Sequence, residues 1–231
     1  MKIERILALA LAFFLTACSD DGDEFLTPGN GHGGSEYNAD AGTLHDLRDG
    51  QTYKTVTIGG RVWMAENLNY ETSTSVLIPE YNGKSRDKYG LLYTWDDAMT
   101  ACPSGWNLPS EKDWNDLVES VGDSATAGTK LKAARDWDKD RGYVIGTDDY
   151  GFAALPAGVS HVNGNGVRSF SNNGAFFWTA TVHEGGRAIL FVMHYEKEVV
   201  ESSRFDKDTW LSVRCIKDSI GQESRKNLPF A

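Results

Sequence analysis

The cysteines carry the most distinctive chemistry in this chain of 231 residues. Cys18 follows Leu15, Thr16 and Ala17 at the end of an apolar run, where cleavage before the cysteine would prepare it for acylation. Basic residues precede the run, which is much shorter than the roughly 18 apolar residues that indicate a membrane-spanning helix. We therefore predict a signal peptide over residues 1–17 and a lipid anchor such as palmitate on Cys18. The alternative, a core helix that happens to carry a thiol, lacks an amphipathic period.

Cys102 and Cys215 remain once Cys18 carries the lipid. In an oxidising extracellular compartment these two thiols should pair, and the long loop that they close would contribute as much as about 4–5 kcal/mol on the chain-entropy model. Two free thiols are the alternative. A zinc site is disfavoured, because neither cysteine has a Cys or His neighbour at zinc-ligand spacing.

His183 and His194 are the histidines whose positions come closest to a metal site. They could approach each other across a hairpin formed by residues 179–182 and 188–193. Two imidazoles without a fixed third ligand make a poor zinc site. We therefore predict no metal there.

Paired carboxylates occur at Asp148 and Asp149 and again at Asp206 and Asp208. Their oxygens suit calcium, but neither pair follows an EF-hand pattern, so calcium remains an alternative to ordinary solvated turns. No grouping of Ser, His and Asp stands out that would identify a hydrolase. We predict no cofactor and a noncatalytic protein, with an unrecognised hydrolase as the alternative.

The net charge of the chain indicates which classes of partner it can bind. The net charge is −10 at pH 7, and removal of residues 1–17 makes it more negative. An acidic chain repels the phosphates of nucleic acid, so we expect no nucleic-acid partner. Acidity keeps an exported domain soluble but does not identify its ligand.

Residues 18–45 are acidic and glycine-rich with little apolar content, and they predict a flexible tether. The acidic cluster over residues 20–24 resembles the surface-export signal of bacterial lipoproteins. We therefore expect a domain anchored to the bacterial outer membrane and facing the cell surface. A merely solvated linker on a domain that faces the periplasm is the alternative.

The regular elements that would position these side chains begin after the tether. Residues 53–64 alternate around Gly59 and Gly60 and predict a hairpin. Ser110 can cap a helix through Val121, because the apolar residues of that stretch fall on one face. Further helices are predicted over residues 95–101, capped by Thr94, and 129–135, and further strands over residues 176–181, 188–193 and 210–216. The class is α+β, with few helices and a twisted antiparallel sheet.

Seven motifs occur in one order along the chain. They are residues 49–56 (DGQTYKTV), 63–68 (WMAENL), 89–95 (YGLLYTW), 102–110 (CPSGWNLPS), 151–158 (GFAALPAG), 178–181 (WTAT) and 212–215 (SVRC). Together they resemble a known family, the Fibrobacter succinogenes major paralogous domain (FISUMP). The resemblance covers about residues 46–217, and it indicates a domain over residues 46–218 followed by a tail over residues 219–231.

The resemblance implies a lipoprotein or secreted protein with a fold similar to the C-type lectin-like and formylglycine-generating enzyme group. Trp106 and Trp114 bracket a run similar to one in that enzyme, and we assign both to anchoring a helix on the sheet. Formylglycine-generating enzymes bind copper through paired active-site cysteines. Here Cys102 and Cys215 stand where the family places a structural bridge, so an enzyme of this type is only the alternative.

Binding by loops on a rigid scaffold is therefore the expected function, with a glycan, polysaccharide or protein as the ligand. The loops concerned are residues 161–168, 183–187 and 195–208, which mix hydrogen-bonding and aromatic side chains. Trp178 and Trp210 are assigned to the core because they lie within predicted strands. The candidate ligand-binding residues are Asn163, Asn165, Arg168, His183, Glu184, Arg187 and Tyr195.

Overall fold

The structure is a computed structural model that describes residues 34–77, 86–137, 144–162, 164–166, 168–171 and 173–219. The predicted signal peptide, Cys18, Asn163 and nearly all of the predicted tail lie outside the described residues. No helix in the described ranges is long and apolar enough to cross a membrane.

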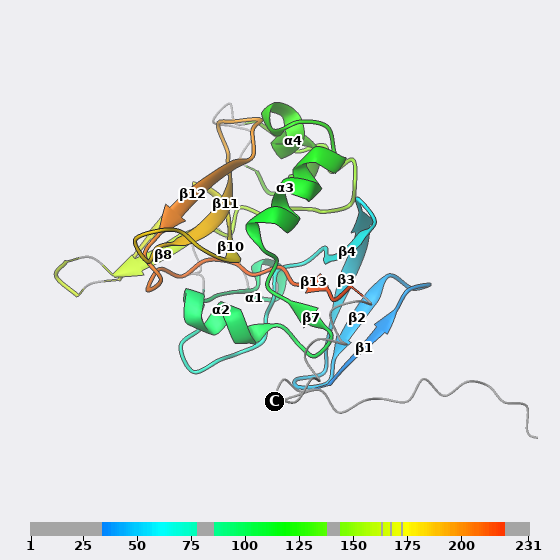
Figure 1. Ribbon diagram of the computed structural model, residues 1–231, viewed down its shortest axis with the longest axis horizontal. Helices are drawn as coiled ribbons and strands as arrows, with labels where there is room; N and C mark the ends of the chain where they lie inside the picture. Colours follow the sequence, from blue (N-terminus) through cyan, green and yellow to red (C-terminus); the bar gives the residue numbers. More distant parts are fainter. Residues whose placement is uncertain are drawn as a thin grey trace, which may run out of the picture.

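A six-stranded antiparallel sheet forms one side of the domain (Figure 1). Its first two strands lie, except for Asp46, within residues 18–45, the stretch predicted as a tether. They pair with each other and with the next strand. The ordered sheet thus begins at Ser35. In spatial order the strands are β1 (Ser35–Asn38), β2 (Thr43–Asp46), β3 (Gln51–Ile58), β4 (Arg61–Met64), β13 (Ile216–Lys217) and β7 (Trp106–Asn107).

The β3–β4 hairpin confirms the prediction for residues 53–64. Gly59 and Gly60 occupy the turn with φ of +59° and +74°, and such tight turns favour glycine because both central residues are left-handed. A side chain at Gly59 would also meet Ser120 Oγ at 2.2 Å, so the turn fits closely against a helix.

Two of the predicted helices are confirmed. Helix α2 (Trp95–Ala101) is capped by Thr94, and α3 (Glu111–Ser120) begins with a capping box between Ser110 and Asp113. In this box Ser110 N donates to Asp113 Oδ2 at 2.9 Å, and Asp113 N donates back to Ser110 Oγ at 3.2 Å. A single turn, α1 (Arg86–Tyr89), precedes them.

The helix predicted over residues 129–135 lies elsewhere, so that prediction is wrong. Helix α4 spans Ser124–Leu131 and begins where Asp123 Oδ1 accepts a hydrogen bond from Thr126 N at 3.1 Å. The chain becomes extended at Lys132, which ends the helix. The local cap therefore determined the start of the helix, five residues before the expected position.

A three-stranded antiparallel sheet forms the other side of the domain and confirms two predicted strands. It consists of β10 (Gly174–Val182), β11 (Ala188–His194) and β12 (Glu201–Phe205), in that spatial order. Core residues cover both of its faces. Helix α3 packs on one face, where Trp114 stacks on Phe191 with ring centroids 5.2 Å apart. Trp178, fully buried as predicted, lies on the other face.

The segment of residues 210–216 runs between the two sheets and is mostly not the regular strand that was predicted. Leu211 and Tyr93 exchange two backbone hydrogen bonds, of 2.8 and 3.0 Å. On the other side, Ser212 N donates to Phe176 O at 3.0 Å. Because its backbone groups alternate between partners from different sheets, the segment forms isolated bridges before it joins β13.

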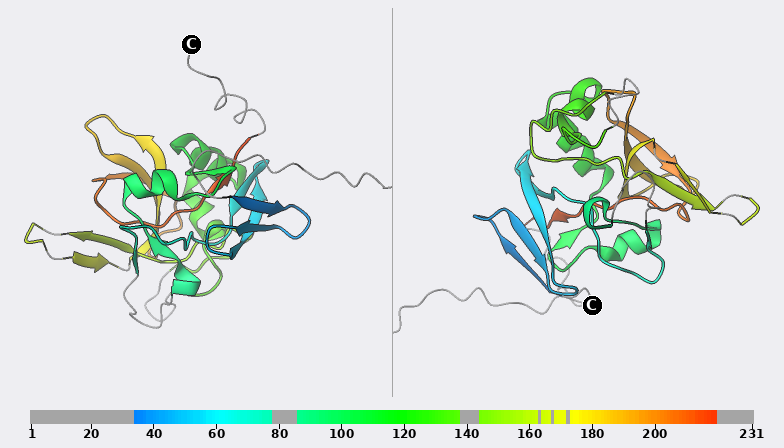
Figure 2. Two further views of the ribbon diagram at one scale, coloured as in Figure 1. Left: turned by 90° about the horizontal axis from the view of Figure 1, so that it is seen from below. Right: turned by 180° about the vertical axis from the view of Figure 1, so that it is seen from behind.

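A hairpin of β8 (Val159–Val162) and β9 (Arg168–Ser171) projects from the body beside the three-stranded sheet (Figures 1 and 2). Trp210 pairs with Ser160 at its base and is only partly buried, so it packs at the edge of the core and not within it. Its ring is covered by the guanidinium of Arg168, which lies 4.6 Å from the ring centroid. One further short pair, β5 (Val76–Leu77) with β6 (Leu91–Leu92), completes a fold whose α+β class is confirmed.

Candidate ligand-binding groove

An open cavity of about 660 Å³ lies against the three-stranded sheet and the β8–β9 hairpin, and we call it the main groove. Its size falls within the range of about 300–1,000 Å³ that is usual for small-molecule sites. Figure 2 shows the β8–β9 hairpin projecting beside the three-stranded sheet. The lining residues named below come from β8, β10, β11 and β12 and from the loops next to these strands.

Apolar side chains line the inner part of the main groove. Phe176 and Val192 face each other across β10 and β11 and are buried, as is Val159 of the hairpin. The rings of Phe176 and Phe205 are stacked at 27°, with centroids 6.2 Å apart. His194 meets the edge of Phe176 at 5.6 Å. The groove thus has an aromatic floor, part of which reaches the surface at the half-buried Phe205.

Charged side chains line the rim. Arg187 Nε donates to Asp206 Oδ1 at 2.9 Å, and both side chains are more than half exposed, at 59% and 66%. Such an exposed pair contributes little to stability, but it holds the two groups together. Arg204 and Asp208 are also exposed and line the groove, and within the described part of the chain neither forms an ion pair. The rim therefore carries balanced positive and negative charge.

A smaller cavity of about 290 Å³, which we call the side cavity, shares Asn173 and His194 with the main groove. Tyr195, Glu196 and Lys197 complete its lining. Asn173 Oδ1 is buried, and no donor reaches it among the described residues. Buried oxygens of this kind normally accept a hydrogen bond, so this one lacks a donor that the described residues could supply.

Lys132 holds the backbone that forms the side cavity. Its fully buried Nζ donates to His194 O at 2.7 Å and to Lys197 O at 2.6 Å. It also lies 4.6 Å from the ring of Trp137. Burial lowers the pKa of Lys132 to about 8, because the charged ammonium loses its hydration. The turn after β11 is therefore fixed from the inside.

The structure brings only some of the predicted ligand-binding residues to these cavities. Arg187 lines the main groove and Tyr195 lines the side cavity. His183 and Glu184 lie in the turn between β10 and β11 and line neither cavity.

The remaining candidates lie on or beyond the projecting hairpin. Asn165 is exposed at its tip, and Arg168 covers Trp210 outside both cavities. Asn163 lies outside the described residues.

His183 and His194 do not approach each other across the hairpin, so that expectation is wrong. The antiparallel register pairs His194 with Gly174, at the end of the sheet away from the turn that holds His183. No group of three or more His, Cys, Asp or Glu side chains that could hold a metal occurs within the described ranges. Of the calcium candidates, Asp206 and Asp208 line the main groove, whereas Asp148 Oδ1 accepts a hydrogen bond from Ala153 N at 2.7 Å.

Sequence reasoning missed the aromatic floor of the main groove and the junction of the two cavities, which is formed by Asn173 and His194. Phe205 alternates with exposed residues in β12, a pattern that could have identified it as inward-facing. Phe176 was expected only as part of a strand. Asn173 carries no local signal, because its position depends on the pairing of β10 with β11.

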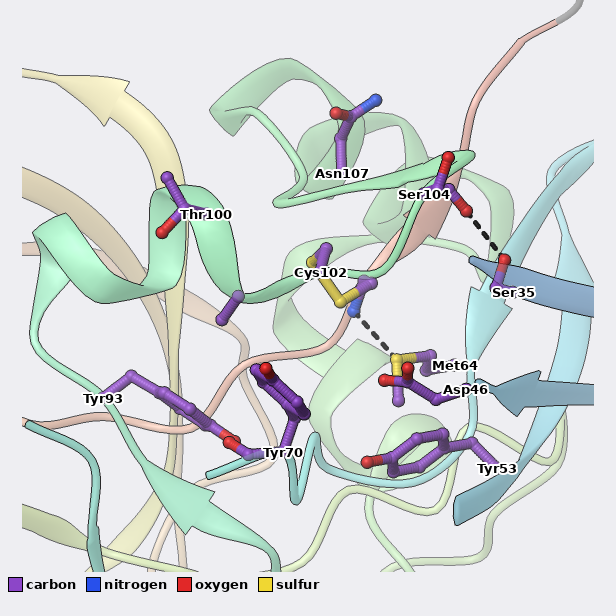
Figure 3. The surroundings of a disulfide bond; sticks show 12 residues. Ser35, Asp46, Tyr53, Met64, Tyr70, Tyr93, Thr100, Cys102, Ser104 and Asn107 are labelled. Carbon is purple, nitrogen blue, oxygen red and sulfur yellow. Dashed lines mark hydrogen bonds between the residues drawn. A yellow bond between two sulfur atoms is a disulfide. The ribbon is translucent and has the colours of Figure 1, made fainter. Parts of the chain in front are cut away.

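Cys102 and Cys215 form the predicted disulfide (Figure 3). The bridge spans 113 residues of sequence and joins the end of α2 to the segment between the two sheets. Both cysteines are buried, and Met64 lies beside them, with Cys215 N 3.4 Å from its sulfur. In this bridged form the two cysteines do not supply the thiol pair that a copper-dependent oxidase of the formylglycine-generating type requires.

Arg214, next to the disulfide, is also fully buried. Its guanidinium donates to Asn67 Oδ1 at 3.0 Å, to Ala153 O at 2.8 Å and to Phe152 O. Burial lowers its pKa to about 9, with Asp148 as the main opposing influence. We read Arg214 as a structural cation that joins the central segment to the 152–153 backbone.

Comparison with known proteins assigns the chain to a family. No curated protein and no solved structure matches it. Residues 56–217, most of the chain and nearly all of the described domain, match the family described as the Fibrobacter succinogenes major domain. The match includes both sheets except β1, β2 and the start of β3, both cavities and the disulfide. The chain therefore belongs to the Fibrobacter succinogenes major domain family.

Proposed function

We propose that the domain is a noncatalytic binding module that holds a carbohydrate in the main groove. The observation that carries the proposal is the combination of an aromatic floor with a rim of hydrogen-bonding side chains. Sites for small polar ligands join apolar walls to a few polar groups that fix orientation. A sugar offers an apolar ring face to Phe205 and hydroxyl groups to Arg187 and Asp208.

The charges of the groove favour a neutral sugar over an acidic one. Two arginines and two aspartates line it, and the protein as a whole carries a net charge of −10. An anionic ligand would be repelled by the protein and would have to compete with Asp206 for Arg187. A neutral glycan can instead use the same donors and acceptors without disturbing the ion pair.

Hydrolysis of the sugar is the second candidate, because glycosidases use a pair of carboxyl groups. Asp206 and Asp208 both line the groove. A catalytic acid is normally held in an apolar setting that keeps it protonated. Asp206 is instead an exposed carboxylate in an ion pair, and Asp208 is exposed as well. These settings favour binding over catalysis.

We also propose the location and the ancestry of the domain. A lipid on Cys18 would anchor it to the outer membrane, and the acidic stretch that follows would direct it to the cell surface. The ordered motifs shared with the family and the capped helix α3, which follows Trp106 and contains Trp114, support a distant relation to C-type lectin-like folds. Display at the surface suits a module that captures a glycan or attaches the cell to one.

The test is a glycan-binding screen of the mature chain with Cys18→Ser, which leaves the protein free of lipid. We expect binding to a neutral glycan that is unchanged by a chelator. Arg187→Ala should weaken it about tenfold, the effect of losing one hydrogen bond to a charged group. Arg135→Ala, which removes an exposed arginine outside both cavities, is the matched control and should bind normally.

Three results would contradict the proposal. Absence of binding to every glycan would favour a protein ligand. Equal loss in the Arg187 and Arg135 variants would place the site elsewhere. Release of reducing ends from a bound glycan, abolished by Asp208→Asn, would establish the hydrolase instead.

A further inference from the structure

We infer that the main groove and the side cavity are consecutive subsites for one unbranched oligosaccharide, which passes over Asn173 and His194. This inference rests on the proposed function, since it specifies the length of the ligand that the same site accepts. It assigns Tyr195, Glu196 and Lys197 to a second sugar position.

The two cavities are contiguous because they share side chains and not merely a region of surface. Asn173 and His194 line both of them. The backbone fixes these two residues side by side, since Gly174 pairs with His194 and Asn173 O accepts a hydrogen bond from Tyr195 N at 3.4 Å. Gly174 allows the close approach, because a side chain there would meet Met193 O at 2.5 Å.

Asn173 offers a hydrogen-bonding group at the junction that the described protein leaves unused. Its Oδ1 is buried and has no donor in the described part of the chain. The last torsion of an asparagine side chain has a broad minimum, so a modest rotation would present the oxygen to either cavity. A sugar hydroxyl next to the glycosidic link is a donor of the required kind.

The side cavity repeats the chemistry of the main groove on a smaller scale. Tyr195 supplies a half-buried aromatic side chain, and Glu196 and Lys197 supply exposed groups of opposite charge. Lys197 is held in turn by Glu201, with Nζ 2.9 Å from Oε2. Both cavities therefore combine an aromatic surface with balanced charge, which suits a repeating neutral chain.

The junction is fixed before any ligand arrives. The buried Lys132 binds the carbonyl oxygens of His194 and Lys197, which lie at the two ends of the side-cavity wall. A preorganised wall does not have to lose conformational freedom when ligand binds, so a second subsite adds its contacts with little offsetting cost.

The test is the dependence of affinity on chain length. Ladders of malto-, cello-, xylo- and manno-oligosaccharides, from disaccharide to hexasaccharide, would be titrated by calorimetry into the lipid-free mature chain. We expect affinity for one ladder to rise at least tenfold with length and then to level off. Glu196→Ala should remove much of that rise and leave disaccharide affinity unchanged, whereas Asn173→Ala should weaken both. Glu198→Ala, an exposed glutamate of the same turn that lines neither cavity, is the matched control.

The outcomes separate this inference from the proposed function. Disaccharide binding with no increase for longer chains would overturn the two-subsite inference and leave the glycan-binding function in place. An increase with length that survives in both the Glu196 and the Asn173 variants would do the same. Failure of all four ladders and of the glycan screen would overturn both. Thermal unfolding of each variant shows whether a lost affinity reflects a lost fold.

Discussion

Lys132 is a buried cation that faces two carbonyl oxygens and an indole ring but no carboxylate at contact distance among the described residues. Its burial is the reason for its low pKa, and the two carbonyl groups are the reason that a lysine is tolerated there. The sequence does not reveal the contacts of Lys132 with the two carbonyl groups and the indole ring, because it places Lys132 in a predicted helix. The residue is therefore a structural part of the site that sequence reasoning could not have found.

The pKa of Lys132 leads to a prediction about alkaline pH. A lysine whose pKa is about 8 in the folded state and 10.5 when unfolded binds fewer protons in the folded state between these values. Stability should therefore rise as the pH increases from about 8 to 10.5, by up to about 3 kcal/mol for this group. Urea unfolding of the wild type and Lys132→Met across this range isolates the effect. Parallel pH curves for the two proteins would show that Lys132 does not titrate in this way.

At the scale of elements, turns and helix caps that depend on neighbouring residues could be predicted. The pairing of strands distant in sequence could not. The β3–β4 hairpin and helix α3 each follow from local signals, a pair of glycines and a capping serine. Residues 210–216 look like one strand, because their apolar content is high. Their partners come from both sheets, and sequence periodicity contains no information about that arrangement.

The candidate site likewise has residues that could be predicted from the sequence and residues that could not. Arg187 and Tyr195 were found because exposed polar and aromatic residues near turns are reasonable guesses. The floor and the junction were not, because Phe176, Asn173 and Phe205 meet only after three strands have paired in register. A groove built across strands is a tertiary property, whereas a helix cap is a local one.

Helix α4 offers a prediction at this scale. Alanine is normally favoured over glycine in a helix by about 1 kcal/mol. At Gly128, however, a Cβ would lie 2.4 Å from Glu198 O and 2.8 Å from Val199 O. Gly128→Ala should therefore destabilise the protein by about 1–3 kcal/mol, because the helix must move away from the turn beside the side cavity.

The measurement is chemical denaturation with Ala125→Gly as a reference. Ala125 is exposed on the same helix, so that variant should lose only the intrinsic propensity of about 1 kcal/mol. A Gly128→Ala protein more stable than the wild type would mean that the helix does not pack this closely.

At the scale of the whole molecule, the disulfide connects regions that are far apart in sequence. Cys102 ends the α2 region, and Cys215 lies 113 residues later, between the two sheets. Sequence reasoning predicted this bridge correctly, because a count of cysteines needs no knowledge of the fold. What it could not show is that both sulfurs lie inside the core, against the six-stranded sheet.

We expect the double variant Cys102→Ala, Cys215→Ala to lose about 3–5 kcal/mol of unfolding free energy, since the bridge closes a long loop in the unfolded chain. Urea denaturation with and without reductant is the measurement. Reductant should lower the stability of the wild type toward that of the variant and leave the variant unchanged. A wild type that is insensitive to reductant under unfolding conditions would argue against the bridge.

The position of β13 has a consequence for the order of folding. This strand comes from the end of the domain, yet it lies between β4 and β7 in the six-stranded sheet. The chain is synthesised from its N-terminus, so β4 and β7 leave the ribosome with their facing edges unpaired. Those edges stay open to neighbouring chains until the last strand arrives. Folding of the domain should thus be completed only after synthesis ends, and premature termination before residue 210 should yield an aggregating product.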